Sequence, residues 1–265
     1  MKPAVLDSHR HSAISDFFER CDLTRPARLL LDYDGTLAPF QTNRHKAHPY
    51  LGIIPILNRI ILTGRTRISI VSGRPIKEIQ RLLYPLENFE VWGAHGLEHV
   101  STSGVYERAC IDPEVLSVLQ QAEDWLCQSD LLSIAELKPG GIAVHWRGLA
   151  PTEAEDILSR VEKGWSRFNE VPGIKLLLFD GGIELRITHP DKGDAIDAIL
   201  VGADPTAAVA FLGDDLTDED AFRALSKRGL SILVRSEYRE TMANVWLRPP
   251  YELMEFLNLW AERLT

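Results

Sequence analysis

The chain has 265 residues, of which 45% are hydrophobic and 25% are charged, and its formal net charge is -9 at pH 7. This composition excludes a disordered chain and a collagen-like repeat, and it can supply one large core or two smaller ones. The acidic balance argues against non-specific nucleic-acid binding and against docking on an anionic membrane surface. We therefore expect neither a nucleic-acid partner nor a membrane partner.

Three scattered cysteines, Cys21, Cys110 and Cys127, form no C-x-x-C pair and have no histidines at zinc spacing. Neither a disulfide framework nor a structural zinc site is expected from them. Residues 1–12 lack the apolar run of a signal peptide. No stretch reaches the roughly 18 consecutive apolar residues of a transmembrane helix. These features predict a cytoplasmic protein.

Short apolar runs, each followed by a segment with helical periodicity, recur between residues 27 and 94 and again from residue 192. Such alternation predicts an α/β fold with a Rossmann-like, doubly wound parallel sheet that is covered on both faces. The expected strands are Arg28–Leu31, Ile68–Val71, Phe89–Trp92, Val209–Leu212 and Leu230–Val234. The expected helices are Leu51–Leu62, Pro75–Leu83, Lys192–Leu200, Glu219–Leu225 and Pro249–Leu264.

Residues 101–189 follow another order: a strand, a helix, two strands, a second helix and two more strands. This order predicts an α+β cap domain inserted into a core formed by residues 1–100 and 190–265. Inserted lids usually cover the carboxyl ends of the strands, where ligands bind. The expected strands are Leu131–Leu137, Ile142–Trp146, Ile174–Phe179 and Ile183–Ile187, with hairpin turns at 138–141 and 180–182, and the expected helices are Pro113–Gln128 and Thr152–Phe168.

Two carboxylates, Asp32 and Asp34, directly follow the first expected strand. Strand alternation places both side chains on one side of the backbone. Two like charges at that distance repel each other, so they point to a bound cation or to proton transfer. Taken alone, the motif fits a simple turn after a strand equally well.

A second acidic group, Asp214 and Asp215, follows the strand Val209–Leu212. The acidic residues at 218–220 fit the first turn of a helix, but helix capping does not explain the first two. The spacing of a calcium-binding EF-hand is absent. Because two parallel strands each deliver carboxylates at their carboxyl ends, we predict a site for a hard cation such as Mg²⁺.

Ser72, Gly73 and Arg74 stand between the strand Ile68–Val71 and a helix that begins with a proline. The hydroxyl and the backbone N–H groups there suit a bound phosphate, although an ordinary helix cap has the same pattern. Lys192 opens another helix, where its charge is poorly matched to the helix dipole. A negative partner is therefore expected for Lys192.

The order of these motifs resembles the haloacid-dehalogenase-like phosphatases. Asp32–Leu37, Ser72–Arg74, Gly93–Glu98 and Gly213–Glu219 resemble the trehalose-6-phosphate phosphatase family in particular, over essentially the whole chain from about Arg28. The resemblance implies a Mg²⁺-dependent phosphatase that hydrolyses trehalose 6-phosphate through an aspartyl-phosphate intermediate.

The resemblance also implies a role for each motif residue. Asp32 would be the nucleophile, and Asp34 the general acid and later the general base. Mg²⁺ would be held by Asp32, the Asp34 backbone carbonyl and Asp214, with Asp215 or Asp218 beside its waters. Ser72, Gly73 and Lys192 would hold the phosphoryl oxygens.

The substrate-binding residues that the resemblance implies are Glu136, Lys138 and Glu184 in the insertion. Arg74 and His95 are further candidates for substrate contact. Carboxylates and an ammonium can each bond several sugar hydroxyls. From the residues alone, a solvated strand face with cross-strand ion pairs explains the three insertion residues as well.

Two other functions stay open. One is hydrolysis of a different glycosyl phosphate, such as sucrose phosphate or a glucosyl- or mannosylglycerate phosphate. The other is a non-catalytic sensor of sugar phosphates. The presence of Asp32, Asp34, Lys192 and Asp214 argues against a sensor, which has no need of Asp34.

Overall fold

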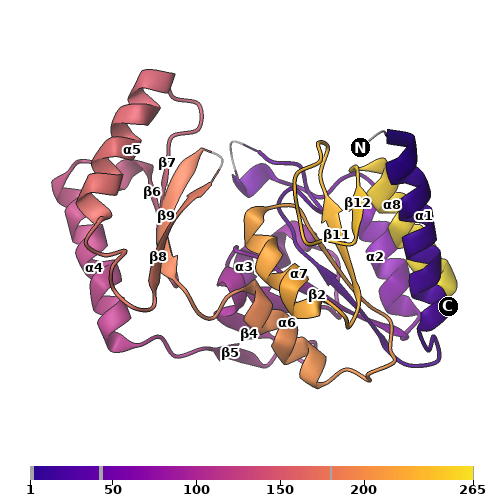
Figure 1. Ribbon diagram of the computed structural model, residues 1–265. Helices are drawn as coiled ribbons and strands as arrows, with labels where there is room; N and C mark the ends of the chain where they lie inside the picture. Colours follow the sequence, from indigo (N-terminus) through magenta and orange to yellow (C-terminus); the bar gives the residue numbers. More distant parts are fainter. Residues whose placement is uncertain (1–2, 42–43, 180, 265) are drawn as a thin grey trace. The chain divides into compact units, whose positions relative to one another are not determined.

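A computed structural model describes residues 3–41, 44–179 and 181–264, with side chains from residue 11 onward. The chain divides into two compact units (Figure 1). The first comprises Met1–Glu107 and Asp191–Thr265, and the second comprises Arg108–Pro190.

The first unit is built on an eight-stranded sheet in the order β12-β11-β10-β1-β2-β3-β4-β5. From β12 to β3 neighbouring strands are parallel, whereas β4 is antiparallel to β3. The strands are β1 (Ala27–Leu31), β2 (Thr66–Val71), β3 (Glu90–Gly93), β4 (Glu98–Val100), β5 (Tyr106–Arg108), β10 (Val209–Gly213), β11 (Leu230–Val234) and β12 (Val245–Leu247). The predicted α/β class with a parallel sheet is confirmed.

Helices cover both faces of this sheet because alternate strand residues are apolar on both sides. Leu29 and Leu31 of β1 belong to one buried cluster, and Leu30 belongs to the other. Residues of α1 (Pro3–Arg20), α2 (Ile53–Leu62), α3 (Ile76–Leu83) and α8 (Tyr251–Arg263) complete the first cluster, and residues of α6 (Lys192–Val201) and α7 (Glu219–Leu225) complete the second. Short 3₁₀ helices occur at η1 (Arg44–Lys46), η2 (Ala94–Gly96) and η4 (Leu216–Asp218).

Helix α1 was not predicted, although its apolar residues carry a signal. Ile14, Phe17 and Phe18 have the i, i+3, i+4 spacing of one helix face. The rings of Phe17 and Phe18 lie with their centroids 6.1 and 5.8 Å from that of Trp260 in α8. Because polar residues interrupt and flank these three apolar residues, the segment contains no long apolar run that would have indicated a helix.

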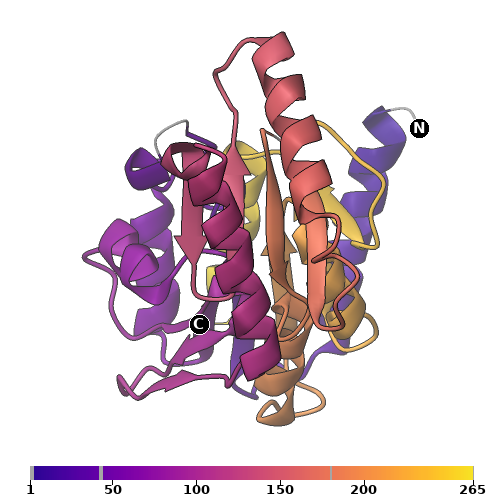
Figure 2. The same cartoon turned by 90° about the vertical axis from the view of Figure 1, so that its left-hand side faces the viewer.

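The second unit is a four-stranded antiparallel sheet in the order β6-β7-β9-β8. Its strands are β6 (Ala135–Lys138), β7 (Gly141–His145), β8 (Ile174–Phe179) and β9 (Gly182–Ile187). Figure 2 shows α4 (Pro113–Gln128) and α5 (Pro151–Trp165) on one face of this sheet. Ile142, Val144, Ile183 and Leu185 are buried on that face, so the polar residues of the strands occupy the other.

One predicted strand, Leu131–Leu137, is wrong in its first half. Leu132–Ile134 forms the 3₁₀ helix η3, and β6 begins only at Ala135. After α4, Asp130 takes a left-handed conformation with φ 56°, and the N–H of Leu131 donates to the Leu126 carbonyl at 2.9 Å. This helix-terminating arrangement keeps the chain coiled, so an extended strand starts later.

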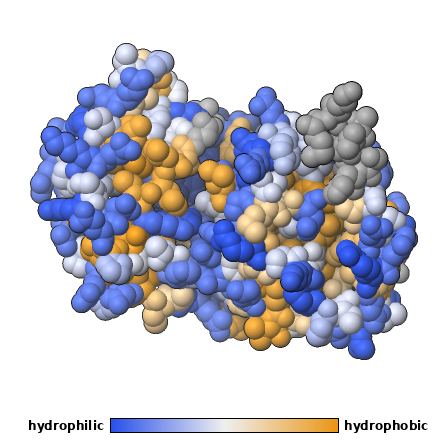
Figure 3. Space-filling model, in the orientation of Figure 1, coloured by the Kyte–Doolittle hydropathy of each residue, from blue (hydrophilic) through white to orange (hydrophobic). Residues whose placement is uncertain are grey.

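The sheet of the first unit also extends beyond the predicted start of the insertion at residue 101. Strands β4 and β5 continue the core sheet, and the second unit starts at Arg108. None of the described helices combines the length and the apolar composition that a transmembrane span needs. The face of each unit seen in Figure 3 is largely hydrophilic, with smaller apolar patches.

Candidate active site

Two aspartates from neighbouring parallel strands meet at one edge of the sheet. Asp32 follows β1 and Asp214 follows β10, and these strands pair in register with Leu31 opposite Leu212. Both side chains are buried. Asp32, Asp214 and Asp218 each offer a carboxylate oxygen, and these atoms lie within 4.8 Å of one another. Among the clusters that could hold a cation in the described chain, this one is fully buried.

A single ammonium lies among these carboxylates. The Nζ of Lys192 donates to Asp32 Oδ1 at 2.7 Å and to Asp218 Oδ1 at 2.6 Å. Asp191 and Asp194 form a capping box at the start of α6, which fixes the helical turn that carries Lys192. The negative partners expected for this lysine are therefore Asp32 and Asp218.

Asp218 organises the loop after β10. Its Oδ2 accepts the backbone N–H groups of Asp214 and Asp215, both at 2.9 Å, while its Oδ1 accepts Lys192. A Cβ on Gly213 would lie 2.4 Å from the Asp218 carboxyl carbon, so only glycine fits there. The sequence indicated Asp218 mainly as a helix-capping residue, and its central place in the cluster was missed.

Burial sets the charge state of the cluster. It raises the pKa of Asp32 to about 7, with Lys192 opposing the shift and Asp218 adding to it. Burial and the neighbouring Asp32 and Asp218 raise the pKa of Asp214 well above its usual range. Burial alone would lower the pKa of Lys192, but the neighbouring Asp218 and Asp32 carboxylates raise it, so the ammonium stays protonated. One ammonium thus faces more carboxylates than it can neutralise.

The donor set fits a small divalent cation. Asp214 Oδ2 is buried and accepts no hydrogen bond from any described residue. Gly35, with φ 77°, brings its backbone against this carboxylate, because a Cβ there would lie 2.1 Å from Asp214 Oδ2. A bound cation would give this carboxylate oxygen the partner that it lacks, and it would offset the neighbouring carboxylates whose pKa values burial raises.

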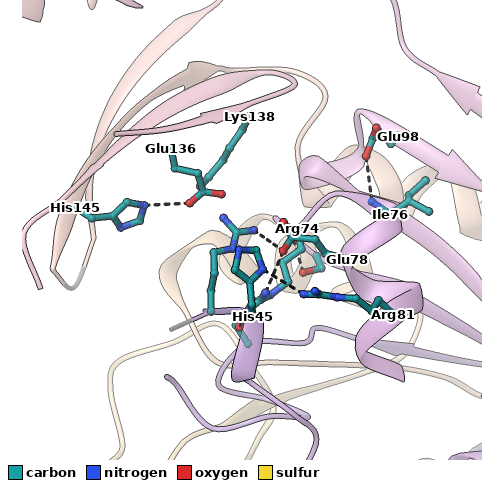
Figure 4. A network of polar contacts seen from close by, with 12 residues as sticks. His45, Arg74, Ile76, Glu78, Arg81, Glu98, Glu136, Lys138 and His145 are labelled. Carbon is teal, nitrogen blue, oxygen red and sulfur yellow. Dashed lines mark hydrogen bonds and ion pairs between the residues drawn. The ribbon is translucent and has the colours of Figure 1, made fainter. Parts of the chain in front are cut away.

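Asp34 forms a two-pronged ion pair with Arg74. Arg74 Nε donates to Asp34 Oδ2 and Nη2 donates to Asp34 Oδ1, both at 2.6 Å. The remaining Nη1 donates to Glu78 at 3.2 Å (Figure 4), and Glu78 also accepts from Arg44 at 3.0 Å. The sequence predicts that Arg74 contacts substrate; the structure places its guanidinium on the Asp34 carboxylate.

Ser72, Gly73 and His95 form a compact turn after β2 and β3. Ser72 is buried, and its Oγ accepts the Arg74 N–H at 3.2 Å. The His95 N–H donates to the Ser72 carbonyl at 3.0 Å. A Cβ on Gly73 would lie 2.6 Å from His95 Nε2, so glycine is required for the imidazole to pack on this turn.

The residues predicted to bind a sugar lie on the helix-free face of the second unit. Glu136 and Glu184 both flank Ala143 of β7, and Lys138 flanks Gly141. Lys138 Nζ donates to Glu184 Oε1 at 2.8 Å, and His145 Nε2 lies 3.0 Å from Glu136 Oε2, a contact drawn in Figure 4. Burial alone would raise the pKa of Glu184, but the Lys138 ammonium lowers it below its usual range. The cross-strand ion pair that the sequence left open is therefore present.

Residues 30–245 match the trehalose-phosphatase family. The chain belongs to this family. The trehalose-phosphate phosphatase of Mycobacterium marinum is 30% identical over 257 residues, which cover 91% of this chain and 63% of that protein. The chain therefore spans only part of the relatives it matches, and it spans 18% of two Mycobacterium tuberculosis proteins named as uncharacterized glycosyl hydrolases.

Solved structures share the fold of this trehalose-phosphatase family member. The C-terminal domain of Candida albicans trehalose-6-phosphate phosphatase has a TM-score of 0.78 at 20% identity, over 95% of this chain and 96% of that chain. A haloacid-dehalogenase-like hydrolase from B. subtilis has a TM-score of 0.61 at 16% identity, over 88% of this chain and 99% of that chain. The haloacid-dehalogenase-like fold expected from the motif order is confirmed.

The raised pKa of Asp32 predicts how the stability of the metal-free protein changes with pH. The pKa of Asp32 in the folded protein, about 7, lies above the ordinary value of 3.8. The Asp32 carboxyl therefore contributes stability that is fully present below pH 3.8 and is lost as the pH rises through about 7. In EDTA, the melting temperature should fall between about pH 5 and pH 8, and Asp32→Asn should flatten this slope. Equal slopes for both proteins would show that Asp32 does not carry the buried charge.

Proposed function

We propose that the chain is a Mg²⁺-dependent phosphatase that hydrolyses trehalose 6-phosphate to trehalose and phosphate through an aspartyl phosphate on Asp32. The observation that carries this proposal is the meeting of buried Asp32 and Asp214 beside Lys192 at neighbouring strand ends. Membership of the trehalose-phosphatase family supports the sugar assignment.

Asp32 is the proposed nucleophile. Its carboxylate attacks phosphorus, an Asp–phosphate bond forms, and the bond from phosphorus to the sugar oxygen breaks. Lys192 on Oδ1 and the Thr36 hydroxyl, 3.3 Å from Oδ2, orient this carboxylate. Ser72 and Gly73 at the end of β2, together with Lys192, hold the phosphoryl oxygens.

Asp34 handles the protons in this scheme. It donates a proton to the leaving sugar oxygen, and it then takes a proton from the water that hydrolyses the aspartyl phosphate. Each Asp34 oxygen accepts one hydrogen bond from Arg74, so each keeps a lone pair with which it can exchange a proton while the ion pair stays in place. Arg74 therefore positions the acid–base group, and its second partner, Glu78, holds the guanidinium in place.

The residues that would hold Mg²⁺ are the carboxylates of Asp32 and Asp214 and the backbone carbonyl of Asp34. When bound, Mg²⁺ would offset the crowded carboxylates and the charge of the phosphoryl group. Asp218 keeps the Asp214 backbone in place, and Asp215 begins the next turn by accepting the Leu216 N–H at 2.7 Å. An acidic chain can thereby accept an anionic substrate.

The second unit is proposed to bind the sugar part of the substrate. Glu136, Lys138 and Glu184 share one face of its sheet, and their charged groups suit several hydroxyls. Arg74 and His95 are the proposed contacts on the first unit. We further propose that the second unit acts as a cap over the phosphate site, which would exclude water before the aspartyl phosphate forms.

Asp32→Asn tests the nucleophile. Phosphate release from trehalose 6-phosphate should fall by roughly three orders of magnitude or more, since the amide cannot form an acyl phosphate. Asp197→Asn, on an exposed position of the same helix as Lys192, should keep full activity. Wild-type activity should vanish in EDTA and return with Mg²⁺. Phosphate release by Asp32→Asn at the original rate would refute the nucleophile, and activity that survives chelation would refute the metal.

Lys138→Met tests whether the second unit binds the sugar. The KM for trehalose 6-phosphate should rise roughly tenfold, because a charge-assisted hydrogen bond is worth about 1.5 kcal/mol. Hydrolysis of p-nitrophenyl phosphate should not change, and neither substrate should be affected by Lys163→Met on the exposed side of α5.

A substrate panel with sucrose phosphate and glucosyl- and mannosylglycerate phosphates completes this test. Equal or better turnover of one of them would overturn the trehalose assignment. Loss of p-nitrophenyl phosphate hydrolysis in Lys138→Met would instead place this lysine outside sugar recognition.

A further inference from the structure

We propose that Arg239 is a positioning residue for the metal-binding loop of the first unit. The loop between β11 and β12, residues 235–244, lies against the turn formed by Asp214 and Asp215. We call residues 235–244 the bracing loop. The inference rests on the proposed function, because it assigns to this loop the task of orienting Asp214 for Mg²⁺.

The guanidinium of Arg239 binds two consecutive carbonyls of the metal-binding turn. Its Nη2 donates to the Asp215 carbonyl at 2.7 Å, and its Nε donates to the Asp214 carbonyl at 3.3 Å. Arg235, in the same loop, adds a longer contact of 3.5 Å to the Asp214 carbonyl. The side chain of Arg239 is 16% exposed, so these bonds are largely shielded from water.

Glu219 anchors the bracing loop to the helix that follows the turn. Its carboxylate pairs with Arg239 Nη1, accepts the Thr241 hydroxyl at 2.7 Å and accepts the Met242 N–H at 2.8 Å. Arg239 Nη1 also donates to the Glu240 carbonyl at 2.9 Å. Because Glu219 neutralises the guanidinium, Arg239 can lie behind the metal-binding turn without presenting a net positive charge to a cation.

These contacts fix the backbone of Asp214 from two sides. Asp218 accepts the Asp214 N–H at 2.9 Å, and Arg239 donates to its carbonyl. The Asp214 Oδ2 atom receives no hydrogen bond from the described residues, so the side chain has little to hold it directly. The direction of this carboxylate toward Asp32 is therefore set through the backbone. Partners of this kind around metal ligands typically affect affinity by about 10- to 100-fold.

Only arginine matches this arrangement. Its planar fork can bond the carbonyls of Asp214 and Asp215 and the Glu219 carboxylate at the same time, whereas the single ammonium of lysine cannot span them. Arg239→Lys should therefore behave much like Arg239→Ala toward Mg²⁺ while keeping the charge. A role through net charge alone would leave Arg239→Lys like the wild type.

The experiment measures the Mg²⁺ concentration that gives half of the maximal rise in melting temperature, for the full chain and its variants. Arg239→Ala and Arg239→Lys should both require about 10- to 100-fold more Mg²⁺. Their kcat for phosphate release should recover toward that of the wild type at saturating Mg²⁺, since Arg239 touches no reacting atom. Arg223→Ala is the matched control. Arg223 lies in α7, the helix that carries Glu219, where it pairs with Asp220 at 2.9 Å, and its side chain is 61% exposed.

The Glu219→Gln variant tests whether Glu219 acts through Arg239. The double variant Glu219→Gln/Arg239→Ala should bind Mg²⁺ no more weakly than Arg239→Ala alone, because both changes release the same brace. Fully additive losses would overturn this arrangement.

Two outcomes separate the inference from the proposed function. If the wild type is stabilised by Mg²⁺ and both Arg239 variants show the same Mg²⁺ dependence, only the bracing role is overturned. A lower melting temperature without a change in Mg²⁺ dependence has the same meaning, since it indicates a merely structural arginine. If the wild type shows no stabilisation by Mg²⁺, the metal site is refuted and the bracing inference with it.

Discussion

Three buried carboxylates, those of Asp32, Asp214 and Asp218, lie close together with a single ammonium, that of Lys192, near the carboxyl ends of β1 and β10. Removing such charges from water is costly unless they are paired, and Lys192 reaches only two of the three. The cost appears as the raised pKa values of Asp32 and Asp214. A divalent cation would relieve it, and the same cation would attract a phosphate. Fold stability and the proposed chemistry thus depend on one electrostatic arrangement.

Much of the first unit supports that arrangement. The parallel pairing of β1 with β10 brings the two aspartates together, and a capping box fixes the turn of Lys192. Asp218 holds the N–H groups of the loop after β10, and Arg239 holds its carbonyls. Asp34 is held separately by Arg74. Each charged group is thus oriented by a neighbour on another element, as a preorganised site requires.

Local patterns in the sequence predict the strands and the residues at their ends. Because Asp32 and Asp214 follow apolar runs of parallel strands, their meeting could be expected without coordinates. Side-chain contacts that do not follow from strand pairing could not be expected in this way. Arg74 and Asp34 are 40 positions apart, and Arg239 and Asp215 are 24 apart, so no periodicity marks these pairs. Helix α1 was missed for another reason, since its apolar stripe is short. Substrate contacts by Glu136, Lys138 and Glu184 stay predictions.

Calorimetric titration of the metal-free protein with Mg²⁺ tests the central claim most directly. The account predicts that one Mg²⁺ binds per chain and that Asp214→Asn abolishes the measurable heat of binding, because the orphaned carboxylate oxygen is removed while the fold is retained. Circular dichroism would verify the fold of the variant. Equal Mg²⁺ affinity in the wild type and Asp214→Asn would contradict the account.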